Sequence, residues 1–446
     1  MIAPERKNDM GDFLTSKYGR MFPDLPAPRA SEDQLLALGR SGAVMDATDD
    51  DAAGDNGCIP AGWTFFGQFI AHDITADRSA LSHHASTERL GNFRVPRLDL
   101  EAVYSFGPMG SPYLYDLRDP DKFLLGTNDE GEPHDVPRNS QGRALTGDPR
   151  NDVHLIISQM HLAFLKLHNA IVDWLRVRSF PAGDIFGEAQ RLARWHYQWI
   201  VVHEFLPLTV GKPLTDDLLR NGRRYYRVAD RPSIPIEFAD AAYRYGHSQI
   251  RAVYQLNDQA RGNIFPDCAG ACPIPAARVL DWRLFFDLDR ENPPQPTRRI
   301  DARLTHSLIT LPGAVVGETE IPEYHSLAVR DLLRGKALEL PSGEAIARDI
   351  GVDPLSSEQL ELGTKVAGWS GETPLWYYVL KEADVLERGE RLGPVGGRIV
   401  AEVLLGLIDA DPTSYRSSAS EWTPELPGRV TGDFTFTDLL AFAGYA

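Results

Sequence analysis

The sequence has 446 residues, of which 43% are hydrophobic and 24% are charged, and these proportions exclude a disordered or low-complexity chain. The 63 acidic residues outnumber the 46 basic residues, which gives a formal net charge of −17. Nucleic acid is therefore not an expected partner, because its binding requires a basic surface.

The N-terminal part, residues 1–55, is polar and rich in turn-forming residues, with an acidic run from Asp46 to Asp55. We interpret it as an arm that precedes a catalytic domain over residues 56–446. The first 20 residues carry charges without an apolar core, which does not resemble a secretory signal. No uninterrupted apolar run is long enough to cross a bilayer. We therefore expect a cytoplasmic protein without a membrane span.

The chain then predicts a series of helices separated by long loops. An aromatic and apolar stretch covers residues 61–75, and a loop-like region follows up to residue 150. Apolar residues recur at helical spacing from near residue 152 to 177, and again over 184–205 and 236–254. Later helices are expected near 325–334, 342–349, 356–363, 375–388 and 395–408. Strand-like alternation is scarce, so the predicted fold is mainly α, a single helical domain with little β structure.

Cysteine and histidine spacing gives few metal-site signals. There are three cysteines, which is too few for a disulfide framework; Cys268 and Cys272 could form a local disulfide or remain two thiols. His154, His161 and His168 are spaced by seven residues and share one helix face. Seven residues rise about 11 Å along a helix, too far for two ligands of one ion. His161 and His168 are therefore interpreted as core residues.

Four segments draw attention together: GQFIAHD at 67–73, GDPRND at 147–152, YRYGH at 243–247 and DLLRG at 331–335. Each alone has an ordinary structural explanation. Their order and spacing resemble the animal-type haem peroxidase family of the peroxidase–cyclooxygenase superfamily, in its bacterial form. The resemblance runs from about residue 56 to 410 and includes QMHLAFLKLHN at 159–169, EFLPLTVG at 204–211 and SLAVRDLLRG at 326–335.

The resemblance implies a mainly helical domain around a buried haem b. On its distal side, His72 corresponds to the acid–base histidine, Gln68 to an amide that holds water or halide, and Arg150 to the distal arginine. Cleavage of peroxide requires a proton to move from one oxygen to the other, which a neutral imidazole can do. A fixed guanidinium stabilises the charge that develops on the leaving oxygen.

On the proximal side, the resemblance identifies His247 as the axial ligand of the haem iron. Arg244 and Arg334 correspond to arginines that contact haem, Arg334 at a propionate. Asp331 stands where many relatives have Asn beside the proximal histidine. A carboxylate there is expected to draw the imidazole proton and strengthen the axial donor.

The resemblance also implies a Ca²⁺ site. Its ligands would be the side chains of Asp73, Asp99 and Glu101 and the backbone oxygens of Val95 and Arg97, a set of hard oxygen donors. Many relatives have Thr where Val95 stands, so one side-chain oxygen is missing. The alternative for Asp73 is a helix or turn cap.

Two departures concern attachment of the haem. The carboxylates that can esterify haem in mammalian relatives correspond to Ala71 and Val153, which cannot form esters, so non-covalent haem is expected. His154 stands where some relatives hold a Met near a haem vinyl group. It could lie at the haem edge, although an ordinary position at a helix N-terminus is the simpler interpretation.

Three functions remain open from the sequence. The first is a peroxidase that reduces hydrogen peroxide while oxidising a small organic donor or a halide. The second is a fatty-acid dioxygenase of the same superfamily, which needs a Tyr three residues before the proximal histidine; Arg244 stands there, with Tyr243 and Tyr245 on either side. The third is a non-catalytic haem-binding protein, which would not need Gln68, His72 and Arg150 together. The sequence identifies neither the reductant nor the oligomeric state.

Overall fold

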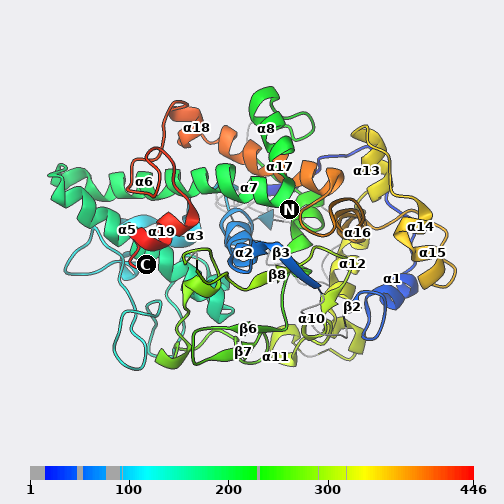
Figure 1. Cartoon of the computed structure of the whole chain (residues 1–446), viewed down its shortest axis with the longest axis horizontal. Coiled ribbons are helices and arrows are strands. Elements are labelled where there is room, and N and C mark those ends of the chain that lie inside the picture. Colours follow the sequence, from blue (N-terminus) through cyan, green and yellow to red (C-terminus); the bar gives the residue numbers. More distant parts are fainter. Residues whose placement is uncertain are drawn as a thin grey trace, which may run out of the picture.

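The computed structural model describes residues 16–47, 54–76, 91–92, 94–228, 232–289, 291–317 and 319–445. Over these residues the chain is mainly helical with short paired strands, so the predicted fold class is confirmed. Helix α2 (Gly62–Ile74) lies near the middle of the molecule (Figure 1), with α5 (Leu155–Val177) and α6 (Ile185–Ile200) to one side and α12 (Leu327–Ala337) and α16 (Leu375–Glu387) to the other.

Helix α2 is the buried centre of the fold. It is apolar on most of its surface, which is typical of a helix enclosed by others. Phe69 stacks on Phe164 of α5 with ring centroids 4.4 Å apart, and Trp63 packs edge-on against Phe286 at 5.4 Å. These contacts fix the rotation of α2, and they leave the face that carries Gln68 and His72, four residues apart, turned towards a cavity.

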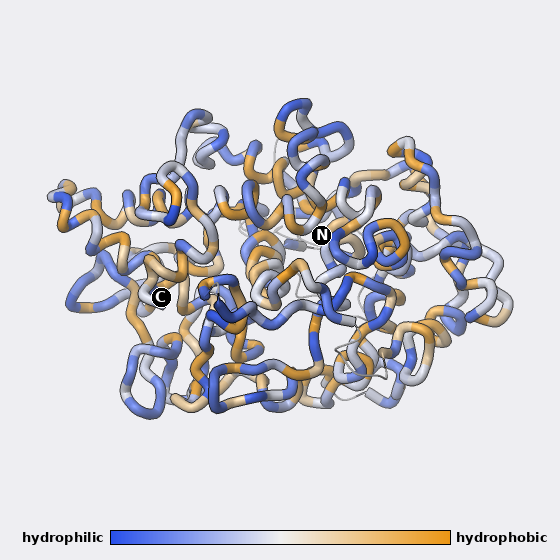
Figure 2. Tube along the Cα trace, in the orientation of Figure 1, coloured by the Kyte–Doolittle hydropathy of each residue, from blue (hydrophilic) through white to orange (hydrophobic). Residues whose placement is uncertain are grey.

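Helix α5 is the longest helix among the described residues. Its first backbone N–H groups are capped by His154, whose Nδ1 accepts a hydrogen bond from the N–H of Ile156 at 3.2 Å. By length and composition it is the single described helix apolar enough to cross a membrane, but 83% of its most apolar window is buried inside the protein. Figure 2 shows apolar residues concentrated in these central helices, as expected for core elements.

The strands are short and pair segments that are distant in the chain. They form one three-stranded group, β4 (Gly91–Asn92), β1 (Ser16–Gly19) and β5 (Ile234–Pro235), and three pairs: β2 (Asp46–Ala47) with β9 (Leu304–Thr305), β3 (Asp55–Pro60) with β8 (Pro296–Arg298), and β6 (Val253–Gln255) with β7 (Arg261–Asn263). The described part of the predicted arm is thus joined to the rest by β1 and β2, and α1 (Glu32–Gly39) packs on α12. The boundary at residue 55 stays a prediction.

Most predicted helices are confirmed, but the one expected over 236–254 is wrong. The chain there forms α9 (Ile236–Ala239), a 3₁₀ helix η8 (Ala242–His247), a turn and strand β6. The break falls at Ala241, where φ is −142° and ψ is −79°, outside the helical region. The apolar residues keep a helical spacing across this break because α9 and η8 each bury one side. The spacing therefore predicts one helix where the chain forms two short ones.

The remaining helices complete the shell around the core. The segment predicted over 184–205 is α6 followed by a π-helical turn η7 (Val201–Phe205), and the later predictions correspond to α12 and to α13 (Gly343–Asp349), α14 (Ser357–Leu360), α15 (Leu362–Lys365), α16 and α17 (Pro394–Ala410). The other helices are α3 (Glu101–Tyr104), α4 (Gly107–Gly110), η4 (Pro112–Leu114), η5 (Pro149–Asp152), η6 (Ala182–Asp184), α7 (Leu206–Val210), α8 (Lys212–Asn221), η9 (Ala276–Arg278), η10 (Trp282–Leu284), α10 (His306–Ile309), α11 (Gly313–Val316), η11 (Pro322–His325), α18 (Tyr415–Ser418) and α19 (Phe436–Phe442).

Candidate active site

A cavity of about 760 Å³ lies beside α2. Its lining includes residues of α2, of the η5 and η8 turns and of the loop 264–271. Of the predicted site residues, five line it: Gln68, His72, Arg150, Arg244 and His247. The structure therefore brings together residues from three of the four segments that the sequence singled out.

His72 is held by a hydrogen-bonded relay behind the cavity. Its Nδ1 donates to Oδ1 of Asn151 at 2.7 Å, and Nδ2 of the same amide donates to Nδ1 of His161 at 3.0 Å. With the amide in this orientation, His72 carries its proton on Nδ1, and its Nε2 is an acceptor. The imidazole is thus arranged to take a proton from a ligand in the cavity.

The protonation state of His72 is set by its surroundings. Burial, and then the positive charge of Arg150, lower the pKa of His72 to about 3, although the hydrogen bond to Asn151 acts in the opposite direction. The side chain is 8% exposed. The imidazole is therefore neutral across the physiological pH range, as a proton acceptor must be.

Arg150 is fixed by a buried carboxylate, Asp148. Arg150 Nε and Nη2 lie 3.0 and 2.9 Å from the two oxygens of Asp148, and Nη2 also donates to the carbonyl oxygens of His72, at 3.0 Å, and Thr75. Burial disfavours the charge of Asp148, but the hydrogen bonds and charges of Arg150 and Arg94 outweigh it and keep the pKa of Asp148 below its usual value. The guanidinium is thereby bound to the same helix turn that carries His72.

The proximal candidate, His247, ends the η8 turn. Its Nδ1 donates to Oδ2 of Asp331 at 2.7 Å, and Oδ1 of Asp331 accepts from Nη1 of Arg244 at 2.6 Å. Burial opposes the charge on Asp331, but Arg244 and His247 hold its pKa below the usual value. A carboxylate therefore stands behind His247, as the sequence predicts.

The two arginines expected at the haem have protein partners. Arg244 Nη2 lies 2.9 Å from Asp240, and its Nε donates to the carbonyl of Ala239 at 3.0 Å. Arg334 is buried, its Nε donates to Asp240, and it is not among the residues that line the cavity. The contacts that Arg334 and Arg244 would make with haem remain predictions.

The residues expected to bind calcium are not arranged as a set of metal ligands. Asp73 accepts hydrogen bonds from the N–H groups of Leu100, at 3.0 Å, and Ala102, at 3.2 Å, which is the capping role that the sequence left open. Burial, and then the nearby charge of Asp99, raise the pKa of Asp73. Glu101 forms an ion pair with Arg94 at 2.9 Å.

Across the described ranges, no group of three or more His, Cys, Asp or Glu side chains is positioned to hold a metal ion. Val95 is exposed and Arg97 is half-buried, and the same loop carries Asp99, whose Oδ1 accepts from the N–H of Glu101 at 3.1 Å. The side chains of Asp73, Asp99 and Glu101 therefore serve local hydrogen bonds and ion pairs.

The other histidines and cysteines have ordinary positions. His168 is a core residue, as predicted: its Nδ1 lies 2.9 Å from Tyr104 Oη and its Nε2 lies 2.8 Å from the carbonyl of Asp121. His154 both caps α5 and lines the cavity, and burial lowers its pKa to about 4. Cys268 is a buried thiol and Cys272 an exposed one.

Sequence reasoning missed Asn151, Asp148, Arg94 and Asp240. Asn151 lies beside Arg150 and Asp148 two residues before it, within the quoted 147–152 segment, but neither of them was assigned a role in the site from the sequence. Asp148 does cap η5, by accepting from the N–H of Arg150 at 2.9 Å, in addition to holding the guanidinium. Arg94 offered no signal in sequence, because its partners lie up to 54 residues away.

Comparison with known proteins agrees with this geometry. The sequence profile of the animal haem peroxidase family matches residues 110–275. Heme peroxidase 2 of Caenorhabditis elegans is 35% identical over 112 residues, 24% of this chain and 16% of that protein. Eosinophil peroxidase of Homo sapiens is 29% identical over 147 residues, 32% of this chain and 20% of that protein. The chain thus spans a fifth or less of the length of these two curated relatives.

Solved structures extend the likeness to the whole fold. Peroxidase A from Dictyostelium discoideum superposes with a TM-score of 0.62 at 14% identity and covers 97% of this chain and 94% of that chain. The fatty acid alpha-dioxygenase of Oryza sativa gives a TM-score of 0.63 at 15% identity, over 90% of this chain and 76% of that chain. The profile match and the peroxidase relatives show that residues 110–275 are similar to animal haem peroxidases, and the solved structures show that the fold of most of the chain is shared with a peroxidase and with an alpha-dioxygenase.

Proposed function

We propose that this protein is a haem-dependent peroxidase that reduces hydrogen peroxide and oxidises a small-molecule donor. The observation that carries the proposal is the pair of imidazoles on one cavity. His72 and His247 come from different elements, and each has its Nδ1 bonded to an acceptor behind it, Asn151 or Asp331. This leaves both Nε2 atoms for chemistry inside the cavity.

The cavity and its donors fit a haem group. Its volume lies within the range of about 300–1,000 Å³ that is usual for cofactor sites. His247 would hold the iron through Nε2, and small residues, among them Gly67, Ala71 and Gly246, leave room along the walls. When bound, the haem supplies the oxidising equivalents that peroxide delivers and the donor consumes.

The distal residues would divide the proton transfer and charge stabilisation between them. Nε2 of His72 accepts the peroxide proton and can return it to the departing oxygen, because burial keeps the imidazole neutral beforehand. Arg150 lies beside it with a fixed positive charge that favours the developing anion. Gln68 lines the same wall from one helical turn earlier and can hold a water or halide.

The finer parts of this proposal rest on individual side chains. Non-covalent attachment is supported by Ala71 and Val153, since both line the cavity and neither side chain can form an ester. The donor class stays open between small organic molecules and halides. A Ca²⁺ ion stays a prediction that the arrangement of Asp73, Asp99 and Glu101 does not support, and it is not carried into the function.

A fatty-acid dioxygenase is the second candidate, favoured by the fold of the Oryza sativa structure. Tyr243 lines the cavity, but its hydroxyl donates to the carbonyl of Gly67 at 3.2 Å, and its ring stacks on Phe238 at 4.5 Å. Oxygen uptake with an unsaturated fatty acid and no peroxide would support this candidate instead.

The test combines an absorption spectrum with kinetics. We expect a Soret band from the haem-loaded protein and turnover of hydrogen peroxide with a phenolic donor. His72→Ala should keep the Soret band and react with peroxide about 100-fold or more slowly, the usual effect of removing a positioned acid–base group. His247→Ala should lose or shift the band. A His72→Ala variant that reacts with peroxide at the wild-type rate would remove the proposed role of His72.

A further inference from the structure

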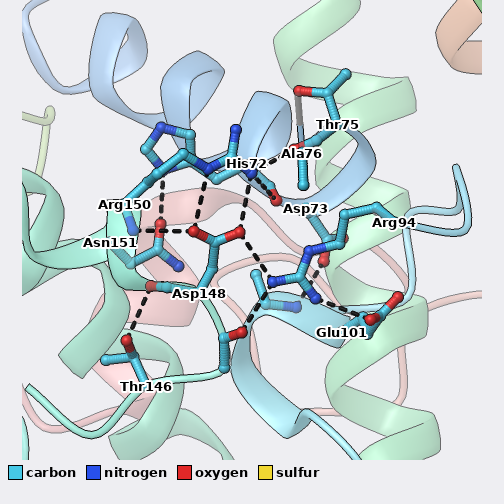
Figure 3. A network of polar contacts seen from close by, with 12 residues as sticks. His72, Asp73, Thr75, Ala76, Arg94, Glu101, Thr146, Asp148, Arg150 and Asn151 are labelled. Atoms are coloured by element: carbon cyan, nitrogen blue, oxygen red, sulfur yellow. Dashed lines mark hydrogen bonds and ion pairs between the residues drawn. The ribbon is translucent and has the colours of Figure 1, made fainter. Parts of the chain in front are cut away.

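A buried arginine, Arg94, lies where three parts of the distal side meet (Figure 3). Its Nη1 forms an ion pair with Glu101 at 2.9 Å, and its Nη2 forms one with Asp148 at 2.8 Å. Nη2 also donates to the carbonyl oxygen of Gly147 at 2.9 Å. The side chain is 7% exposed, so these contacts are made largely away from water.

The shared carboxylate of Asp148 connects Arg94 to the cavity. Asp148 is bound by Arg94 on one side and by Arg150 on the other, and its side chain is 2% exposed. Arg150 lines the cavity, whereas Arg94 does not. Figure 3 shows the two guanidinium groups reaching the same carboxylate from opposite sides, with His72 above it. Arg94 can therefore act on the distal site through Asp148 and Arg150.

The position of Arg94 also bears on the expected calcium ion. The ligands predicted for that ion include the side chains of Asp73 and Glu101 and come, apart from Asp73, from the loop 95–101. In the structure the Glu101 carboxylate is bound to a guanidinium, and Asp73 is occupied by the backbone N–H groups of Leu100 and Ala102. A cation is thus already built into the chain at this junction.

We propose that Arg94 is a positioning residue of the distal site, and that its guanidinium replaces the calcium ion by tying Glu101 to Asp148 and thereby fixing Arg150. The guanidinium suits this task because its planar fork reaches several oxygens in fixed directions. A lysine would keep the charge but could not reproduce the fork. Without Arg94, the half-buried carboxylate of Glu101 would lose its ion pair, and the buried carboxylate of Asp148 would keep only Arg150.

The first arm of the test measures metal content and thermal stability, and does not depend on activity. Wild-type protein purified without chelator should contain far less than one calcium per chain, and a calcium chelator should leave its melting temperature unchanged. Arg94→Met should lower the melting temperature. One calcium per wild-type chain, or a melting temperature that falls on chelation, would overturn the replacement of calcium by Arg94.

The second arm rests on the proposed peroxidase function. Arg94→Met should slow the reaction of the haem-loaded protein with peroxide by about 10- to 100-fold, the effect of misplacing a catalytic group by about 1 Å. Arg94→Lys should restore the charge and only part of the rate. If Arg94→Met does not fold, Arg94→Lys alone must be slower than wild type. Arg143→Met, which removes an exposed arginine from the loop before η5, is the control and should react as wild type.

A double-mutant cycle separates positioning from general damage. Because Arg94 acts through Arg150, Arg94→Met should slow the reaction little further when Arg150 is already Met. Equal slowing by Arg94→Met with and without Arg150 would contradict the positioning role. If wild-type protein shows neither haem binding nor peroxide turnover, the proposed function fails. The calcium and stability measurements still decide whether Arg94 replaces the ion.

Discussion

The carboxylate of Asp331 is shared between His247 and Arg244. Oδ2 accepts a hydrogen bond from His247 Nδ1 at 2.7 Å, while Oδ1 accepts one from Arg244 Nη1 at 2.6 Å. A carboxylate behind an axial imidazole increases the anionic character of that imidazole, and the arginine reduces this effect by attracting the same charge. In the proposed haem protein, Asp331 and Arg244 would therefore shift the reduction potential of the iron in opposite directions.

We predict that Asp331→Asn raises the reduction potential of the haem iron and that Arg244→Gln lowers it. Asn offers a neutral acceptor, so the imidazole stabilises iron(III) less; removing Arg244 leaves the full carboxylate charge to His247. Spectroelectrochemical titration of both variants measures the two shifts. Shifts in the same direction would show that the potential follows solvent exposure of the haem rather than the charge on His247.

Asn151 provides a test of the relay behind His72. Asn151→Ala removes the acceptor of the His72 Nδ1 proton, so the imidazole can take the other tautomer and lose its acceptor at Nε2. Stopped-flow measurement should show a slower reaction with peroxide than wild type, but a faster one than His72→Ala. Asn151→Asp keeps the acceptor and serves as the control, with a rate closer to wild type. An Asn151→Ala rate equal to wild type would contradict the relay.

Haem attachment can be examined chemically. Ala71 and Val153 line the cavity with methyl and isopropyl groups, which give packing contacts and no bond to the porphyrin. Acidified organic solvent should therefore extract all the haem from the protein, and mass spectrometry should find unmodified haem b in the organic phase. Haem that remains on a peptide containing Asp73, Asp152 or His154 would show a covalent link that these positions do not predict.

Buried histidines should make the protein sensitive to acid. Burial is the first cause that lowers the pKa of five buried histidines from the usual 6.5, His72 to about 3 and the others to about 4: His154, His161, His168 and His196. Because these pKa values are lower in the folded state, the stability they provide is complete above pH 6.5 and is lost as pH falls towards 4. Denaturant unfolding between pH 7 and 4.5 should show a steep loss.

A single substitution gives the size of this effect. Each such histidine contributes up to about 1.4 kcal/mol per pH unit to the slope of unfolding free energy in this window. His196→Gln should therefore make the slope shallower by about this amount. Two carboxyl groups, Glu204 and Glu382, have pKa values that burial raises to about 7, so the stability they contribute falls as pH rises and does not mimic the acid loss. An unchanged slope in His196→Gln would contradict the assignment.

The sequence predicted what depends on local patterns and on family resemblance. The long apolar periodicities gave α5, α6, α16 and α17, because burial of one helix face leaves a repeat that can be read directly. The same rule failed over 236–254, where two short helices on either side of Ala241 keep the repeat across a break in the backbone. His72 and His247 were found through motif order, and the structure brought them to one cavity.

The supporting residues could not be found in this way. Asp148 and Asn151 are polar residues in a loop, and their roles depend on which side chains the fold brings within hydrogen-bond distance. Arg94 meets Asp148 across 54 positions, and Asp240 meets Arg334 across 94. One sequence contains no periodicity that reveals such pairs, so the ion pair between Arg94 and Glu101 could not be set against the calcium prediction from the sequence alone.

The pairing of β1 has a consequence for how the chain reaches its folded state. Tyr18 pairs with Ile234, and Arg20 Nη2 donates to the carbonyl of Leu338 at 2.6 Å, 318 positions away. During synthesis from the N-terminus, Ile234 is made only after about half of the chain, and Leu338 only after about three quarters. Contacts of such long range form late, because the loop they close must be ordered first. Tyr18 and Arg20 should therefore be among the later residues to dock, and the surfaces around Ile234 and Leu338 that receive them should stay open to chaperones and to aggregation until they do.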